Sequence, residues 1–163
     1  MAEQDQKAIK RVRETLVFDD SVQRANTERL KEIIEKSGWP SIDLVGKKAS
    51  RSAWLIIQHA DHDVRFQKKC LALMHEIYKR DTQNISQENI AFLTDRILVN
   101  TKQKQLFGTQ FYVNKKGAFT YRPIKDFKTL AKRRKGYGLP PFKEYVDASK
   151  SVKPLRIKGF RQK

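Results

Sequence analysis

The chain has 163 residues, 39% of them hydrophobic, which is enough to bury the core of one globular domain. Its 35 Lys and Arg residues outnumber its 18 Asp and Glu residues, and the net charge of +17 favours phosphate-rich partners. The composition excludes a disordered chain, the single cysteine excludes an internal disulfide, and no apolar run is long enough to cross a membrane.

The first 100 residues show the apolar spacing of helices. Asp19 and Asp20 can cap a helix that extends to about Lys36 and stops at Ser37-Gly38. After a short connection over 41–46, the spacing predicts helices over about 48–59 and 64–79, and a third helix that Ser86 caps. The apolar stripe of the second of these includes Cys70, which we therefore interpret as a core residue.

After Asn100 the helical spacing gives way to segments typical of β-strands. Residues 105–113 and 118–122 are rich in β-forming and aromatic side chains, and the turn sequence Asn114-Lys115-Lys116-Gly117 separates them. Asp126 can cap a basic helix that ends near Lys135, and Pro140-Pro141 begins a short helix to about Ala148. The pattern predicts an α+β fold, mostly helical with one β-hairpin. We expect a single domain over 1–148 and a flexible basic tail over 149–163.

The segment Gln58-His59-Ala60-Asp61-His62-Asp63 contains two of the three histidines of the chain. His59 lies four positions after Leu55 and three after Ile56, so it faces inward or lines a cleft at a helix end. An imidazole there can act as a general acid or base, and Asp61 can orient it if the chain bends between them. A buried structural histidine is the alternative reading.

A metal site is a weaker hypothesis for the same segment. His59 and His62 are three positions apart and can share one helix face. Protein zinc sites need three or four ligands, however, and the chain has no HExxH motif and no cysteine pair. We therefore expect neither a metal nor another cofactor.

Four further side chains are candidates for a binding site. Arg96 can clamp a phosphate or carboxylate with its planar guanidinium, or Asp95 and Arg96 can both pair with charged groups on neighbouring helices. Gln105 and Gln110 stand among apolar residues, and alternation along a strand sends them to opposite faces unless Gly108 marks a bulge. A half-buried glutamine needs partners, either from the backbone or from a ligand.

The C-terminal part of the chain carries much of the positive charge. From Phe127 to Lys163 there are 12 basic and two acidic residues. Basic groups interleaved with aromatic rings are typical of nucleic-acid binders, whereas a solvated helix and a disordered end are the alternative. The candidate nucleic-acid contacts are Lys132, Arg133, Arg134, Lys135, Tyr137, Arg156, Lys158 and Arg161.

Several motifs in a fixed order carry a resemblance: Gly38-Trp39-Pro40, Ala53-Trp54-Leu55, Gln58-His59-Ala60-Asp61, Leu93-Thr94-Asp95-Arg96 and Gln105-Leu106-Phe107-Gly108-Thr109-Gln110. Through them the chain resembles, from about residue 26 to 145, a bacterial family known only as a domain of unknown function. The resemblance implies a shared fold and a shared site that includes His59, Asp95, Arg96, Gln105 and Gln110, but no activity. The strong positive charge and the basic tail depart from the family pattern.

Our leading hypothesis is therefore the binding of a phosphate-rich partner, most simply RNA. In its sharper form the protein cleaves or modifies RNA without metal, with His59 as general acid or base. Arg96 would then stabilise developing negative charge, and the two glutamines would orient the substrate. The alternatives are a small-molecule hydrolase or transferase centred on His59, and a non-catalytic protein-interaction module. Because the N-terminal residues lack the apolar core of a signal peptide, we expect a cytoplasmic protein.

Overall fold

The computed structural model describes residues 21–151 and confirms an α+β fold that is mostly helical. Its elements are α2 (Ser21–Ser37), α3 (Ile42–His59), α4 (Val64–Arg80), α5 (Gln87–Asn100), β1 (Phe111–Val113), β2 (Phe119–Tyr121), η1 (Phe127–Thr129), α6 (Leu130–Gly136) and α7 (Phe142–Ser151). The predicted hairpin is confirmed, because β1 and β2 pair in antiparallel fashion with Phe111 opposite Tyr121. No helix among residues 21–151 is long and apolar enough to cross a membrane.

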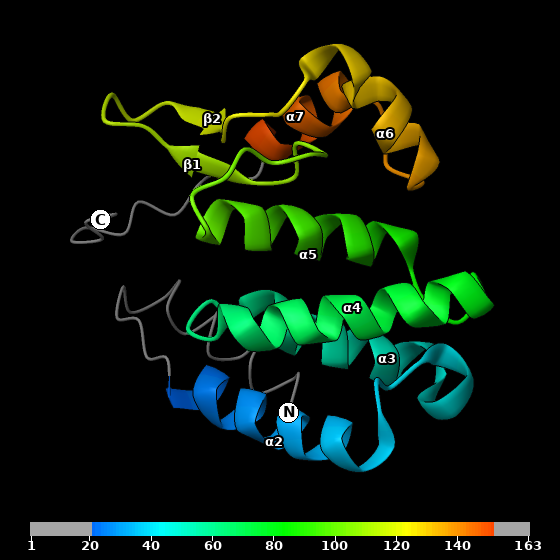
Figure 1. Ribbon diagram of the computed structural model, residues 1–163. Coiled ribbons are helices and arrows are strands. Elements are labelled where there is room, and N and C mark those ends of the chain that lie inside the picture. Colours follow the sequence, from blue (N-terminus) through cyan, green and yellow to red (C-terminus); the bar gives the residue numbers. More distant parts are fainter. Residues whose placement is uncertain (1–20, 152–163) are drawn as a thin grey trace.

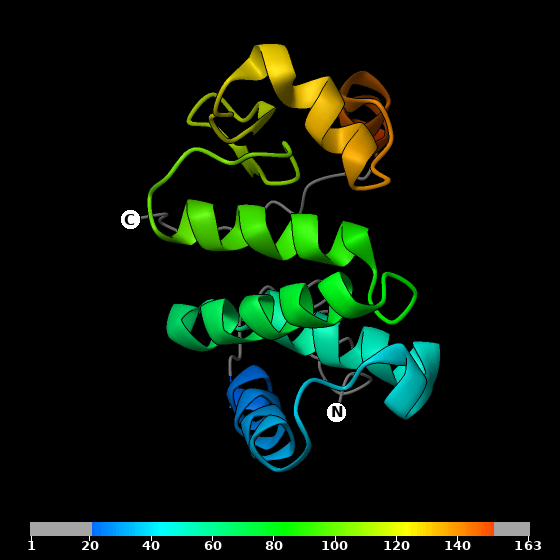
Figure 2. The same ribbon diagram turned by 45° about the vertical axis from the view of Figure 1, so that its right-hand side comes forward.

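The elements form two stacked parts (Figures 1 and 2). Helices α2 to α5 make a helical body, residues 21–100. The hairpin, η1, α6 and α7 make a C-terminal layer, residues 101–151, which lies on the side of α5 that faces away from α4. Helix α5 is therefore the element on which both parts pack.

Helix α4 shows how local sequence determines these elements. The Asp63 side chain accepts a hydrogen bond from the backbone N–H of Phe66 at 2.9 Å, which satisfies one of the free donors at the helix start. Phe66, Cys70 and Met74 then recur at four-residue spacing and are buried in the core. Burial raises the pKa of the Cys70 thiol to about 12, so this residue is an inert core side chain, as the spacing predicts.

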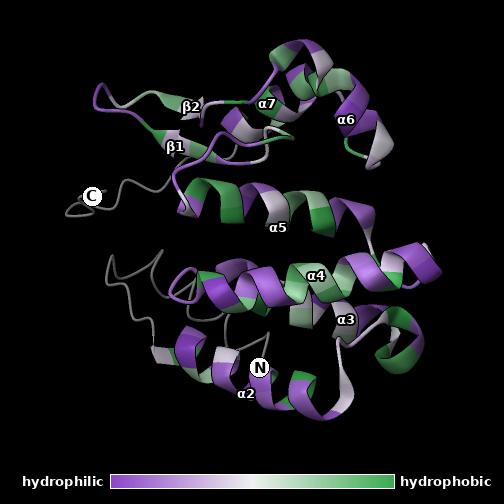
Figure 3. Ribbon diagram, in the orientation of Figure 1, coloured by the Kyte–Doolittle hydropathy of each residue, from purple (hydrophilic) through white to green (hydrophobic). Residues whose placement is uncertain are grey.

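The apolar core divides at α5. One cluster contains Ile90, Leu93 and Ile97, and all its fully buried members come from the helical body. A second, smaller cluster joins Ala91 of the same helix to Phe107 and Leu139 of the C-terminal layer, with Phe92 packed beside it. Figure 3 shows apolar stretches along α5 between the two parts. The helix is therefore buried on two faces, and this explains its low content of charged side chains.

Two predicted boundaries are wrong. The predicted connection over 41–46 is helical from Ile42, although Gly46, with φ +76° and ψ 163°, interrupts α3 with a kink. The predicted strand from residue 105 is confined to Phe111–Val113, because residues 105–110 form a loop whose backbone bonds run to a buried carboxylate and to a glutamine side chain. Only an isolated parallel bridge joins Gln105 to Ile124.

The basic helix is confirmed as η1 followed by α6, but Asp126 does not cap it in the predicted way. Asp126 has a left-handed backbone, with φ 43°, and its carboxylate accepts a hydrogen bond from the Thr129 hydroxyl at 2.6 Å. Helix α7 continues past the predicted domain end at Ala148, to Ser151. The rest of the predicted tail, 152–163, lies outside the described residues.

Candidate functional site

The turn between α3 and α4 carries Asp61, the acidic residue predicted to orient His59. Helix α3 ends at His59, after which Ala60, with φ −79° and ψ 50°, leaves the helical conformation. The backbone N–H of Asp61 donates to the His59 carbonyl at 2.9 Å, and the N–H of Asp63 donates to the Ala60 carbonyl at 3.0 Å. This tight turn brings Asp61 to the C-terminal half of α5.

Asp61 binds the guanidinium of Arg96 in a bidentate arrangement. Nε of Arg96 donates to Oδ1 of Asp61 at 2.7 Å, and Nη2 donates to Oδ2. Asn100, one turn further along α5, donates its side-chain N–H to the same Oδ1 at 2.7 Å, and Gln67 of α4 donates to it at 3.4 Å. The side chains of Arg96 and Asp61 remain 30% and 43% exposed, so this polar network lies at the surface.

Arg96 also reaches the loop before β1. Its Nη1 donates to Oε1 of Gln110 at 3.3 Å, while the Gln110 amide nitrogen donates to the Thr109 hydroxyl at 3.1 Å. Three donors of the guanidinium are therefore engaged within the protein, and the Asp61 carboxylate balances its charge. An incoming phosphate would compete with Asp61 for the same face of the fork. In this arrangement Arg96 joins the α3–α4 turn to the C-terminal layer.

Gln105 is fully buried, and its amide bonds only to backbone. Its Nε2 donates to the carbonyls of Gln110 at 3.1 Å and Arg122 at 2.7 Å, and its Oε1 accepts from the Gln110 N–H at 2.8 Å. Its backbone N–H donates to the Pro123 carbonyl at 3.0 Å, and its carbonyl accepts from the Lys125 N–H at 2.8 Å. The side chain holds the loop closed instead of facing a substrate, which is the backbone alternative for a half-buried glutamine.

Asp95 has a comparable role on the other side of the loop. Its buried carboxylate accepts hydrogen bonds from the N–H groups of Leu106 at 2.7 Å, Phe107 at 3.0 Å and Thr109 at 2.9 Å, and from the Thr109 hydroxyl at 3.0 Å. Burial raises the pKa of Asp95, and these donors, which stabilise the charged form, offset part of that shift. Asp95 therefore anchors the loop, while its neighbour Arg96 points to Asp61.

Gly108 allows the loop to close against α7. Its φ is +71°, and a Cβ atom there would lie 2.6 Å from Cε2 of Phe142. Both the backbone conformation and the close approach require glycine. The glycine therefore marks contact with a helix that follows more than 30 positions later, and not the strand bulge that would align the two glutamines.

His59 is half-buried at the end of α3, close in sequence to the Asp61–Arg96 pair. The Asp61 carboxylate, its predicted orienting partner, accepts hydrogen bonds from Arg96 and Asn100. Residues 21–151 contain no group of three or more His, Cys, Asp or Glu side chains suited to a metal ion. An imidazole suits proton transfer at neutral pH, so His59 stays a candidate general acid or base beside this turn.

The basic cluster of α6 is split between interior and surface. Arg134 is 1% exposed, and it donates to the carbonyls of Phe107 at 2.5 Å and Pro140 at 2.8 Å. Arg133 donates to the Leu106 carbonyl at 2.7 Å and to the Lys125 carbonyl at 2.6 Å. Both guanidiniums therefore hold the C-terminal layer together, Arg134 from a buried position and Arg133 with its side chain 22% exposed.

The other predicted nucleic-acid contacts near α6 also differ in their exposure. Tyr137 is partly buried and packs against Phe107, with ring centroids 4.7 Å apart. Lys132 and Lys135 are exposed and remain candidate phosphate contacts. The predicted tail contacts Arg156, Lys158 and Arg161 lie outside the described residues.

A group of exposed lysines in the C-terminal layer does not figure among the predicted contacts. Residues 101–151 contain 13 Lys and Arg but three Asp and Glu, whereas residues 21–100 contain 13 and 10. We call six of these lysines the basic surface: Lys102, Lys104, Lys115, Lys116, Lys125 and Lys128, all of them exposed. Between residues 101 and 128 the only acidic residue is Asp126, and that local imbalance is visible in the sequence.

The sequence matches DUF6624, described as a family of unknown function, over residues 11–158. The chain belongs to this family. The match confirms the resemblance to an uncharacterised domain that the ordered motifs indicate. Comparison with curated proteins and with solved structures gave no significant match.

The DUF6624 match spans both parts of the fold. It includes the α3–α4 turn, α5 and the whole C-terminal layer, so the polar network and the basic surface lie inside the family region. Membership of DUF6624 carries no activity with it. A function for this chain has to be argued from its own residues.

Proposed function

We propose that this protein binds RNA, or a comparably phosphate-rich partner, through the basic surface of its C-terminal layer. The observation that carries the proposal is the separation of charge between the two parts of the fold. The 13 basic residues of the helical body are nearly balanced by 10 acidic ones, whereas 13 basic residues of the layer face three. Binding to a polyphosphate releases condensed counterions, and this favours a surface with many cations and few anions.

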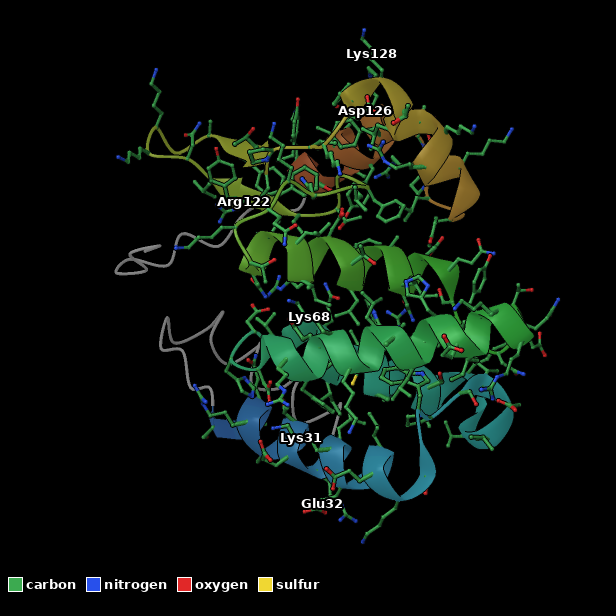
Figure 4. All side chains as sticks on the ribbon, in the orientation of Figure 1. Lys31, Glu32, Lys68, Arg122, Asp126 and Lys128 are labelled. Atoms are coloured by element: carbon green, nitrogen blue, oxygen red, sulfur yellow. The ribbon has the colours of Figure 1, made fainter. Side chains whose placement is uncertain are left out.

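The lysines of the basic surface come from three connections. Lys102 and Lys104 follow α5, Lys115 and Lys116 form the hairpin turn, and Lys125 precedes η1. The Lys125 N–H donates to the Gln105 carbonyl at 2.8 Å, so the backbones that carry Lys104 and Lys125 run side by side. In Figure 4 the sixth lysine, Lys128, extends outward from the top of the layer. Flexible, solvated ammonium groups of this kind suit phosphate contacts without sequence preference.

The test is a salt titration of RNA binding with two matched triple variants. Replacing Lys104, Lys125 and Lys128 with Ala should weaken binding of a fluorescent RNA about tenfold or more and lower the slope of log K against log salt by up to about three. Replacing the exposed lysines Lys36, Lys47 and Lys48 of the helical body removes the same charge and should change binding little. Affinity that is insensitive to salt, or equal losses in both variants, would overturn the proposal.

A second candidate function is His59-dependent cleavage or modification of the bound RNA. The supporting observation is that the partly exposed Asp61–Arg96 pair and Gln110 form one hydrogen-bonded network at the joint between the helical body and the layer, and that His59 ends the helix just before the turn that carries Asp61. His59 would act as general acid or base without metal. Because Asp61 already binds Arg96, the main role of this arginine would be to position the α3–α4 turn. It would bind a phosphate only if the phosphate displaced the Asp61 carboxylate.

His59→Gln and His62→Gln make a matched pair for this candidate, since both residues flank the same turn and His62 is exposed. Purified protein is incubated with total RNA, with and without a chelator, and the products are separated by size. Cleavage should survive chelation and the His62 change but not the His59 change. If the folded His59→Gln protein still cleaves RNA, His59 is not the acid or base.

A further inference from the structure

We infer that Tyr121, Phe127 and Phe142 form a platform on which unpaired bases of single-stranded RNA stack. We call these three rings the aromatic platform. The inference rests on the proposed function, and it names the form of RNA that the C-terminal layer prefers.

The three rings come from three different elements and meet at Phe142. The centroid of Tyr121, in β2, lies 5.1 Å from that of Phe142, in α7, and that of Phe127, in η1, lies 5.7 Å from it. The interplanar angles are 77° and 81°, so neither ring lies flat on Phe142. Such perpendicular contacts hold the outer rings in place and leave their faces less covered than parallel stacking would.

Exposure separates this group from the other aromatic pairs. Phe127 is 56% exposed and Tyr121 is 39% exposed, while Phe142 is partly buried beneath the loop at Gly108. By contrast, Phe111 and Phe119 on the hairpin stack in parallel, at 7° and 4.9 Å, and so cover each other. Phe127 and Tyr121 are therefore fixed, accessible rings, as base stacking requires.

The charges around the platform identify its partner. Lys125 and Lys128 flank Phe127 in the sequence and are exposed, and Figure 4 shows Lys128 and Asp126 together at the top of the layer. Asp126 is engaged, because it accepts the Thr129 hydroxyl and lies 4.0 Å from Arg133. Protein–protein interfaces are depleted of lysine, whereas single-stranded nucleic-acid sites combine cations for the phosphates with rings for the bases. Charge complementarity therefore favours a polyanion with exposed bases over a protein.

The backbone before Phe127 supports the same reading. Asp126 adopts φ 43°, a conformation that costs energy for any residue other than glycine, although Asp tolerates it better than most. The Thr129 hydroxyl, bonded to the Asp126 carboxylate at 2.6 Å, stabilises the turn. The turn holds Phe127 at the surface instead of letting it join the core nearby.

The test compares oligouridine with an RNA duplex of the same number of nucleotides, using the full chain. Phe127→Leu keeps an apolar side chain but removes the ring, and it should weaken oligouridine binding about fivefold or more while changing duplex binding less than about twofold. Phe127→Tyr retains a stacking face and should bind both RNAs as the unaltered protein does. A single-stranded RNA that contains 2-aminopurine should lose fluorescence on binding to the unaltered protein, and less so with Phe127→Leu. Thermal unfolding checks that both variants are folded.

The outcomes distinguish the platform from the proposed function. If the lysine variant weakens binding but Phe127→Leu binds oligouridine and quenches 2-aminopurine normally, the platform is wrong and the basic surface stands. If Phe127→Leu weakens both RNAs equally, the ring does not select single strands and the inference also fails. If neither change affects binding, the proposed function is wrong and the platform falls with it.

Discussion

At the scale of single residues, arginine and lysine divide the work of the C-terminal layer. The planar guanidinium of arginine has five donors in a fixed fork, so one side chain can satisfy several carbonyls at once. Arg133 and Arg134 do this inside the layer, where they bind the carbonyls of the 105–110 loop and its neighbours. Lysine carries a strongly hydrated ammonium that stays in solvent, as at Lys132 and Lys135. A run of four basic residues thus contains two structural and two accessible cations.

We predict that Arg134→Lys destabilises the protein by about 2–4 kcal/mol, because the ammonium cannot replace both bonds, to the Phe107 and Pro140 carbonyls, in that buried site. The free energy of unfolding is measured by urea titration. Lys132→Ala is the control on the same helix, and since Lys132 is exposed it should change stability by less than about 0.5 kcal/mol. Equal stability of Arg134→Lys and the unaltered protein would show that the buried bonds contribute little.

The sequence identifies several residues of the network but not their partners. The motifs select His59, Arg96, Gln105 and Gln110, and the structure joins Arg96 to Gln110 as one bonded pair. The partner of Arg96 is Asp61, 35 positions earlier, and no periodicity links residues so far apart. Arg133 and Arg134 are also less exposed than the lysines beside them. A count of charges in the sequence cannot show this difference, because it treats all four residues alike. The sequence gives the type of each side chain, whereas tertiary packing determines its environment.

At the scale of elements, the sequence predicts helices and strands well where residues close in sequence determine them, and poorly where distant residues do. Helices α4 and α5 begin where Asp63 and Ser86 cap them, because a cap and an apolar stripe are both local features. The strand expected from Gln105 fails for a different reason. Asp95, on the preceding helix, collects the N–H groups of Leu106, Phe107 and Thr109, and these donors are then not available to a sheet. A buried carboxylate overrides β propensity there.

Asp63 offers a prediction about one element and its pH dependence. It caps α4, and its carboxylate also lies 2.8 Å from Nζ of Lys31. Figure 4 labels Lys31 on α2, the outer helix of the body. The hydrogen bond from Lys31, and then that from the Phe66 N–H, lowers the pKa of Asp63. Asp63→Ala should cost about 1–2 kcal/mol, whereas Asp63→Asn keeps an accepting oxygen for the cap and should cost about 0.5 kcal/mol.

The sign of the pH effect follows from the lowered pKa. The folded state favours the ionised carboxylate, so its contribution is complete above the unfolded-state pKa of about 3.9 and is lost as the pH falls through the lower folded-state value. The stability gap between the unaltered protein and Asp63→Asn should therefore close on acidification, as measured by urea titrations at neutral and acid pH. A gap that stays constant with pH would show that the ion pair is not its source.

At the scale of the whole molecule, a nearly neutral helical body supports a strongly basic layer. The contacts that attach the layer to α5 include the hydrogen bonds to the Asp95 carboxylate, the bond from Arg96 to Gln110, the cluster of Ala91 with Phe107 and Leu139, and the edge contact of Phe92 with Tyr145. Within the described range 21–151, the large cluster of the body draws its buried members from residues 30–97 alone. The body thus has a core of its own, whereas the layer depends on α5 for much of its packing. The surface proposed to bind RNA is therefore supported by one face of this helix.

Asp95→Asn should therefore loosen the layer and spare the body. Both carboxylate oxygens accept donors, Oδ1 from Leu106 and Phe107 and Oδ2 from Thr109, so either orientation of an Asn amide points an N–H₂ group at an N–H or O–H donor. We expect a loss of about 2–3 kcal/mol, faster amide hydrogen exchange in β1, β2 and α6, and weaker RNA binding. Amides of α3 and α4 should keep their protection. Glu88→Gln, an exposed acidic residue in the first turn of the same helix, should leave exchange in both parts unchanged. Equal acceleration in α4 and in the layer would mean instead that the two parts open as one cooperative unit, with α5 transmitting the loss of a single carboxylate through both of its buried faces.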